Sequence, residues 1–330
     1  MLPVNCGSHA DYQNFVVTNL RKYYPNPDAL APSTGDIIER FWNLDLSYTD
    51  ELLKDTYSKF GPVPRTPSCM QRSYLLSIDF NVTSLTQWAA QLKMNPLYAI
   101  LSGFEVGDTP GVGTFYDFIK RLWNSDNNHL SSHIHPIKEK VKKPKTKGTK
   151  ADSMEKVTVA QLLPQLENTK FHIDDQPYSS LFKIYKHEFL DVSVSKGLID
   201  TSSLALAGDG TPVVTSHRER KKRICNCAEE QTSRLLLKYG RTVHVAMKDN
   251  PRLFNMPPRD SEEWKTEYNV RTSAERSNKR EKLDFKLEDG RHRSTKMWYC
   301  RLYHILMLQH LDAWDLPYES PLRKLILQTA

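Results

Sequence analysis

A run of lysines near the middle of the chain limits which segments can fold. Residues 137–150 hold seven lysines against one glutamate, are interrupted by Pro144, and contain only Ile137 and Val141 as apolar side chains. Such a segment cannot bury enough apolar surface to offset the entropy lost when it is ordered. We therefore predict a basic disordered linker over 124–152, which acts either as a solvated tether or as an arm that follows DNA phosphates.

The composition sets broad limits on the rest of the chain. A length of 330 residues suits about two domains. Lys and Arg number 46 against 39 Asp and Glu, a formal net charge of +7, which permits a polyanionic partner without demonstrating one. We expect no membrane partner and a cytoplasmic location, because the sequence has no long apolar run, no leader-like start and too few cysteines for a disulfide framework.

The part before the linker, 1–123, is predicted to be helical. Ser84 and Gln87 have the spacing of a capping box, and apolar residues then recur at helical spacing up to Leu92. The Gly-Val-Gly sequence before Thr114 lacks the third glycine and the preceding strand of a phosphate loop. We expect a loop there, followed by a helix that Thr114 caps.

The part after the linker is predicted to mix helices with strands. The apolar run 203–214 reads as a buried strand that presents Asp209 between two glycines. A second strand is expected over 241–247, with Asp249 just past its end.

Helical spacing of apolar residues predicts three helical regions, within 153–200, at about 261–283 and at about 296–311. Four aromatic residues at or beyond the start of the last region follow helical spacing, and we interpret them as core rather than as platforms for base stacking. They are Trp298, Tyr299, Tyr303 and Trp314.

Four polar residues in the penultimate helix have an unusual arrangement. Tyr268, Arg271, Glu275 and Lys282 are separated by 2, 3 and 6 residues, and in a continuous helix they would share one stripe about 60° wide. A phenol, a guanidinium, a carboxylate and an ammonium on one stripe suit a charged ligand, since the carboxylate can hold a divalent metal and the cations can hold phosphates. The alternative is a solvated face with internal ion pairs, such as Glu275 with Lys279.

This spacing resembles the signature of a large family of bacterial insertion-sequence transposases, which carry an Asp-Asp-Glu triad on an RNase H-like fold. Other blocks that are similar to the family lie at 208–212, 239–243, 248–254, 271–278 and 287–293. The resemblance covers most of the chain. It implies an α/β RNase H-like catalytic domain over 153–330, preceded by an all-α domain over 1–123.

The chemistry that the resemblance implies is DNA transposition, in which Mg²⁺ (or Mn²⁺) supports phosphodiester hydrolysis and strand transfer at transposon ends. Asp209 would be the first metal ligand and Glu275 the third. The partner would be double-stranded DNA with terminal inverted repeats, bound by a monomer or a homodimer. The residues expected to contact DNA or phosphate are Tyr268, Arg271, Lys282, Arg276 and Lys279.

The middle aspartate of the triad is missing from its expected place. Only Asp249 and Asp260 lie between Asp209 and Glu275, and Asp260 is expected to cap a helix. The family fold needs three strands and a helix before the middle aspartate, or over about 40 residues, yet 39 residues separate Asp209 from Asp249 and include a basic run and a cysteine pair. We therefore predict an internal deletion near 216–238 that shortens the catalytic domain and impairs it, with Asp249 as a less favoured substitute ligand.

Two further alternatives stay open. The chain could be a non-catalytic DNA-binding remnant that holds transposon ends or inhibits an intact transposase, or a generic basic helical binding module. Cys225 and Cys227 are interpreted as unpaired thiols, with half of a depleted zinc site as the alternative.

Overall fold

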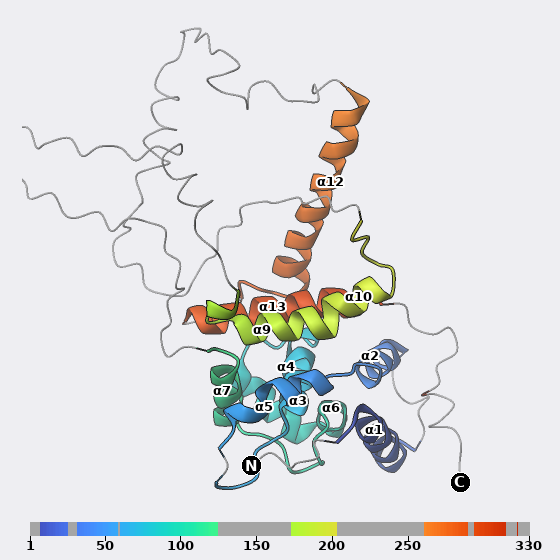
Figure 1. Ribbon diagram of the computed structural model, residues 1–330. Coiled ribbons are helices and arrows are strands. Elements are labelled where there is room, and N and C mark those ends of the chain that lie inside the picture. The colour runs from blue at the N-terminus through green and yellow to red at the C-terminus, as the bar shows by residue number, and fades with distance from the viewer. Residues whose placement is uncertain are drawn as a thin grey trace, which may run out of the picture.

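The structure is a computed structural model that describes part of the chain in detail. The ranges described are 7–25, 32–58, 60–124, 173–202, 261–289 and 294–314, together with Leu322. Across these ranges 72% of the residues are helical and none belongs to a strand (Figure 1). The two strands expected at 203–214 and 241–247, the predicted deletion at 216–238 and most of the predicted linker lie outside the described residues.

The expected α/β RNase H-like fold for 153–330 is wrong for this structure. The described residues of that region form helices, and those helices bury their apolar faces against other helices where the prediction placed a sheet. A sequence pattern of period 3.6 predicts that a helix has an apolar face, but it does not state what covers that face. The all-α expectation for the N-terminal region agrees with the helices observed there.

The described residues before the predicted linker form seven α-helices, whose arrangement can be followed in Figure 1. A short 3₁₀ turn, η2 (Lys54–Thr56), follows the third of them. The helices are α1 (His9–Tyr23), α2 (Pro32–Trp42), α3 (Ser47–Leu53), α4 (Pro67–Asp79), α5 (Leu85–Met94), α6 (Pro96–Ser102) and α7 (Val112–Arg121).

Helix α4 is the centre of this arrangement. Nearly all of its residues are buried, and it contacts α3, α6, α7 and α13. Its polar side chains are therefore enclosed, and each of three finds a partner inside. Arg72 donates to the Leu44 carbonyl at 3.1 Å, and Ser73 accepts from the Trp88 indole at 3.0 Å. Oε1 of Gln71 lies 3.1 Å from Nε2 of His304.

Local sequence signals place several helix starts. Ser84 caps α5 as predicted, with its Oγ accepting from the Gln87 N–H at 3.5 Å. Helix α7 begins at Val112, two residues before the predicted cap at Thr114, and it follows Gly111 without a side-chain cap. The expected helix is present, but Val112 and Gly113 belong to it, so the loop predicted at these residues and the cap predicted at Thr114 are wrong.

The chain just after α7 is held against the residues at the start of α9. The backbone N–H of Asn124 donates to the Pro177 carbonyl at 2.7 Å. The Asn124 side chain donates to Ser179 Oγ at 2.5 Å and accepts from Ser180 Oγ at 2.9 Å. The end of α7 and the start of α9 are therefore joined directly.

The later helices pack on the earlier ones. After a 3₁₀ turn, η3 (Ile173–Asp175), come α9 (Ser179–Tyr185), the π-helical turn η4 (Lys186–Leu190) and α10 (Asp191–Ser195). Together with α13 (Thr295–Ala313) they lie across the N-terminal helices (Figure 1). Helix α13 contacts α4, α7 and α9, and apolar residues from both sides of the predicted linker share one buried cluster.

The aromatic residues of α13 belong to the core, as predicted. Trp298 is buried, and Tyr299 stacks on Tyr178 with ring centroids 5.0 Å apart. Trp314, just beyond the helix, stacks on the buried ring of Phe189 at 5.9 Å. These rings fix α13 against α9 and η4.

Helix α12 (Glu262–Lys279) differs from the others because it projects away from the packed helices (Figure 1). It continues into the π-helical turn η6 (Arg280–Asp284), which leads towards the start of α13. Among the helices that the structure describes, none combines the length and apolar character needed to cross a bilayer.

Candidate nucleic-acid interface

Helix α12 forms although most of its surface faces solvent. Ser261 caps its first turn, its Oγ accepting a hydrogen bond from the Trp264 N–H at 3.1 Å. Two glutamates lie in the first turn, and Arg276 and Lys279 lie in the last, so both ends complement the helix dipole. The cap is one residue later than the predicted Asp260.

Three of the four signature residues lie on α12. Tyr268, Arg271 and Glu275 share one face there, because each residue advances the helix by about 100°. Lys282 falls in the π-helical turn η6, where hydrogen bonds span five residues and the turn is wider. The expected stripe therefore ends before Lys282, whose Nζ lies 3.1 Å from Oε1 of Glu288.

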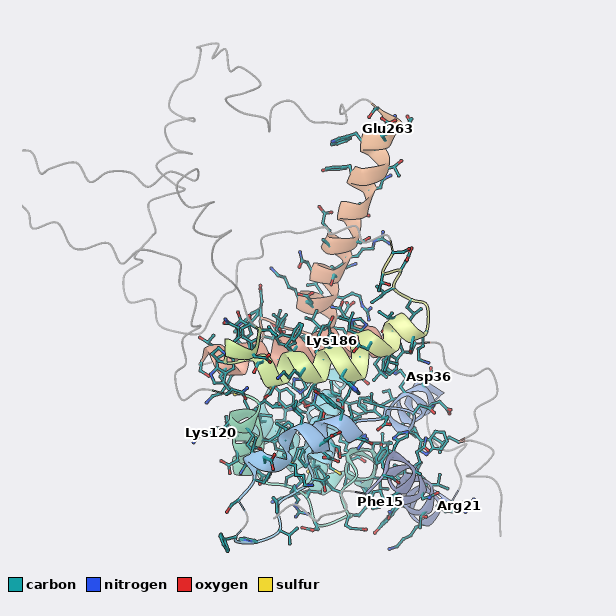
Figure 2. All side chains as sticks on the ribbon, viewed as in Figure 1. Phe15, Arg21, Asp36, Lys120, Lys186 and Glu263 are labelled. Atoms are coloured by element: carbon teal, nitrogen blue, oxygen red, sulfur yellow. The ribbon has the colours of Figure 1, made fainter. Side chains whose placement is uncertain are left out.

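A partly exposed aromatic pair lies near the free end of α12. The rings of Trp264 and Tyr268 stack with centroids 4.5 Å apart and planes inclined by 16°, and Tyr268 is 46% exposed. Side chains around Glu263, at the tip of this helix, project into open space (Figure 2). Stacked aromatic faces at i, i+4 can receive a nucleic-acid base as well as each other.

Charge is distributed unevenly along α12 and η6. Residues 262–268 hold three glutamates and one lysine, whereas 271–282 hold five Lys or Arg against two glutamates. Arg276 donates to the carbonyl and the hydroxyl of Thr272 at 3.4 and 3.2 Å, and both acceptors are neutral. Lys279 is exposed. The half of α12 nearer the packed helices is therefore the electropositive half.

The base of α12 is fixed to the packed helices by polar contacts. Ser277 Oγ donates to Gln309 Oε1 at 3.0 Å. Arg280 pairs with Asp312 at 2.5 Å, and the same carboxylate pairs with Arg40 of α2. The direction in which α12 projects is thus set by contacts with α13.

The expected metal ligands are only partly placed. Asp209 and its substitute Asp249 lie outside the described residues, as do Cys225 and Cys227. Glu275 lies exposed on α12. Within the described ranges, no three His, Cys, Asp or Glu side chains gather as a metal site requires. The Mg²⁺ site with Asp209 and Glu275 as ligands therefore stays a prediction of the sequence.

A buried polar cluster between α13 and α4 was not predicted from the sequence. His304 is fully buried, with Nδ1 2.6 Å from the Cys300 carbonyl and Nε2 3.1 Å from Gln71 Oε1. Burial lowers the pKa of His304 to about 3, so the ring is neutral at physiological pH. Its partners lie more than two hundred residues apart in sequence, so periodicity could not have indicated the cluster. We interpret this cluster as a structural contact between α13 and α4 and not as a binding site.

No family model, curated protein or solved structure matches this chain. Helix α12 and the turn after it are the features from which its function can be inferred.

Proposed function

We propose that this chain binds double-stranded DNA through α12 and η6, as expected of a protein of the insertion-sequence transposase type. The observation that carries the proposal is a projecting helix that bears three of the four signature residues, a partly exposed aromatic pair and a basic half. The occupants we expect are the terminal inverted repeats of a transposon.

The dimensions of α12 suit a DNA groove. Its 18 residues span about 27 Å at 1.5 Å per residue, and the major groove, about 12 Å wide, accepts one α-helix. Because α12 projects from the packed helices, a duplex could approach it without displacing the core. Its principal packing within the described part of the chain is with its own continuation, η6.

Charge suggests how the duplex lies on the helix. Phosphates would avoid the first turn, where Glu262 and Glu263 repel them, and would follow the basic half and η6. Arg276 and Lys279 would position the backbone, because phosphate contacts fix register without reading sequence. Tyr268 and Trp264 would meet bases or sugars near the free end.

The salt dependence of binding tests this proposal directly. A protein that neutralises phosphates releases counterions, so log affinity falls with log salt by about 0.9 per phosphate contact. We expect the double variant Arg276→Gln, Lys279→Gln to bind a terminal-repeat duplex more weakly and to reduce the slope by about two. Fluorescence anisotropy between about 50 and 200 mM salt measures both.

A matched control removes two charges far from α12. Lys22→Gln, Lys93→Gln alters exposed lysines of α1 and α5, and glutamine keeps helix propensity close to that of lysine. The control is expected to leave the slope unchanged. A salt-independent affinity for the unaltered chain, or equal losses in both double variants, would contradict DNA binding at α12.

A catalytic form of the proposal adds Mg²⁺-dependent cleavage and strand transfer. It is supported by the sequence signature, with Asp209 and Glu275 as ligands and Mn²⁺ as an alternative ion. The binding form is favoured because its residues lie on the described α12, whereas Asp209 does not.

End cleavage separates the two forms. If the chain is catalytic, Glu275→Gln should abolish Mg²⁺-dependent nicking of terminal-repeat DNA while DNA affinity is kept, because the amide removes the metal ligand and preserves shape. Arg271→Gln should instead weaken binding. No nicking by the unaltered chain in Mg²⁺ or Mn²⁺ leaves the binding form alone, and nicking that survives both Glu275→Gln and Asp209→Ala would refute this ligand assignment.

A further inference from the structure

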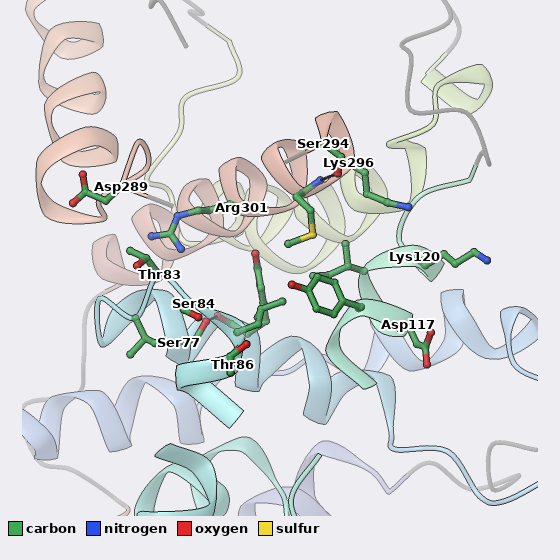
Figure 3. A pocket seen from close by; sticks show the side chains of 16 residues that line it. Ser77, Thr83, Ser84, Thr86, Asp117, Lys120, Asp289, Ser294, Lys296 and Arg301 are labelled. Carbon is green, nitrogen blue, oxygen red and sulfur yellow. Dashed lines mark hydrogen bonds between the residues drawn. The ribbon is translucent and has the colours of Figure 1, made fainter. Parts of the chain in front are cut away.

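A cavity of about 840 Å³ lies beside the N-terminal ends of α5 and α13, remote from the free end of α12 (Figure 3). Three cationic side chains line it, Lys120 from α7 and Lys296 and Arg301 from α13. Two carboxylates, Asp117 and Asp289, appear on opposite sides of it (Figure 3). Its hydroxyl groups come from Ser77, Thr83, Ser84, Thr86 and Ser294.

Two helix N-termini open onto this cavity. Ser84 caps the ten-residue α5 and Ser294 caps the 19-residue α13, and both serines line the wall. The first-turn N–H groups of a helix have no acceptor within it, so those of Thr86 and Lys296 are available by position. Helix dipoles add positive potential at the same ends.

Arg301 is a second and independent indication that the cavity takes an anion. Its side chain is 2% exposed, and its Nε is buried without a hydrogen-bond partner. The guanidinium donates through Nη2 to the carbonyls of Phe285 and Lys286, at 2.8 and 3.3 Å, and the Asp289 carboxylate in the same wall acts on its charge. A buried cation is costly unless an anion or sufficient hydrogen bonds compensate it.

The segment that holds Arg301 is conformationally constrained. Lys286, which offers one of the two carbonyls, has φ of 50°, a left-handed conformation that is unfavourable for a non-glycine residue. Such backbone persists where surrounding contacts demand it. Figure 3 shows that guanidinium between Asp289 and Thr83.

We propose that this cavity binds a phosphate monoester. Two helix N-termini, three cations and several hydroxyl donors match a dianion with three acceptor oxygens. The volume exceeds what a bare phosphate needs and falls within the range of about 300–1,000 Å³ typical of small-molecule sites, so the group esterified to the phosphate is also accommodated. Tyr116, 52% exposed in the wall, offers a ring to a nucleobase.

The phosphate could come from a free nucleotide or from the 5′ end of a DNA strand, and both present the same group. Isothermal titration calorimetry of the full chain with AMP and with adenosine tests the shared chemistry. We expect AMP to bind at least tenfold more tightly than adenosine. Duplexes with a 5′-phosphate and a 5′-hydroxyl then distinguish the sources, since only the DNA-end source predicts a preference between them.

Variants that change the charge of the cavity wall test whether the bound group is an anion. Lys120→Gln with Lys296→Gln is expected to weaken AMP binding at least tenfold, and Asp117→Asn is expected to strengthen it, because Asp117 is an exposed carboxylate in the wall. Thermal melts check that each variant folds. Arg301→Lys keeps the positive charge but removes the planar guanidinium. This variant is expected to bind AMP more weakly and to bind adenosine as the unaltered chain does.

Failure here and failure of the proposed function are distinguishable. The α12 variant Arg276→Gln, Lys279→Gln should leave AMP binding intact, because neither residue lines the cavity. Equal affinities for AMP and adenosine, or an Asp117→Asn variant that weakens AMP binding while folding normally, would overturn the phosphate site whatever the result with DNA.

Discussion

At the scale of single residues, a buried carboxyl group joins two distant parts of the chain. Glu188, in the π-helical turn η4, accepts hydrogen bonds from the backbone N–H and the hydroxyl of Thr49, each at 2.8 Å. It thereby caps the first turn of α3 from another helix. The side chain is 4% exposed, and burial raises the pKa of Glu188 to about 8.

The raised pKa predicts how stability changes with pH. The folded state holds the proton of Glu188 more tightly than the unfolded state, so the favourable contribution is complete below the ordinary value of 4.5 and is lost as pH rises towards 8. We expect Glu188→Gln to remove this loss, which amounts to a few kcal/mol. Urea unfolding at about pH 5 and pH 9 measures it.

Glu51→Gln provides the matched control, because Glu51 is exposed on α3. That variant should follow the unaltered chain at both pH values. If Glu188→Gln lost as much stability on going from low to high pH as the unaltered chain, Glu188 would not be the group responsible.

At the scale of elements, α12 shows how a projecting helix is kept in one direction. An isolated helix of this length is marginal in water, so its cap at Ser261 and the contacts at its base matter. The pair between Arg280 and Asp312 is the strongest of those contacts by charge, with side chains 39% and 23% exposed. Partial exposure limits its contribution to global stability to about 1 kcal/mol.

Asp312→Asn is expected to loosen α12 without unfolding the protein. The variant removes the partner of Arg280 and leaves every cation of the proposed DNA surface in place. Hydrogen–deuterium exchange should accelerate in α12 and stay slow in α4, which is buried nearly throughout. Asp55→Asn, at an exposed site in η2, should change neither. Unaltered exchange in α12 would show that this ion pair does not hold the helix.

The sequence predicted elements better than their packing. Helices were predicted at about 261–283 and 296–311, and the structure confirms both, although Ser261 and not Asp260 caps the first and its regular part ends at Lys279. The π-helical turn η6 could not be predicted, because spacing arguments assume a constant rotation per residue, and Lys282 therefore left the expected stripe. The cavity could not be predicted either, since Lys120 and Arg301 approach it from helices far apart in sequence.

At the scale of the whole molecule, α13 brings described helices from both sides of the predicted linker into one core. Its buried residues face α4 and α7 on one side and α9 on the other. Ile305 and Met307 are fully buried in the cluster that also contains N-terminal residues. The described parts of the chain therefore share one core across the predicted linker.

A shared core predicts cooperative unfolding. Ile305→Ala is expected to cost about 2–5 kcal/mol, because it removes buried methyl groups and leaves a cavity. Since the core is continuous, exchange protection in α4 and in α9 should fall together and with the same denaturant midpoint. Leu283→Ala, at a residue 65% exposed, should cost little. Separate midpoints for α4 and α9 would mean that the two regions fold independently.

The hydrogen bonds between Asn124 and the start of α9 affect which changes in sequence length this chain can tolerate. These bonds bring residue 124 next to Pro177, Ser179 and Ser180, so described residues on either side of the intervening sequence lie close together. The entropy of closing a loop grows only with the logarithm of its length. Sequence can therefore be inserted, removed or exchanged between these residues at a small entropic cost, while the helices on either side keep their packing.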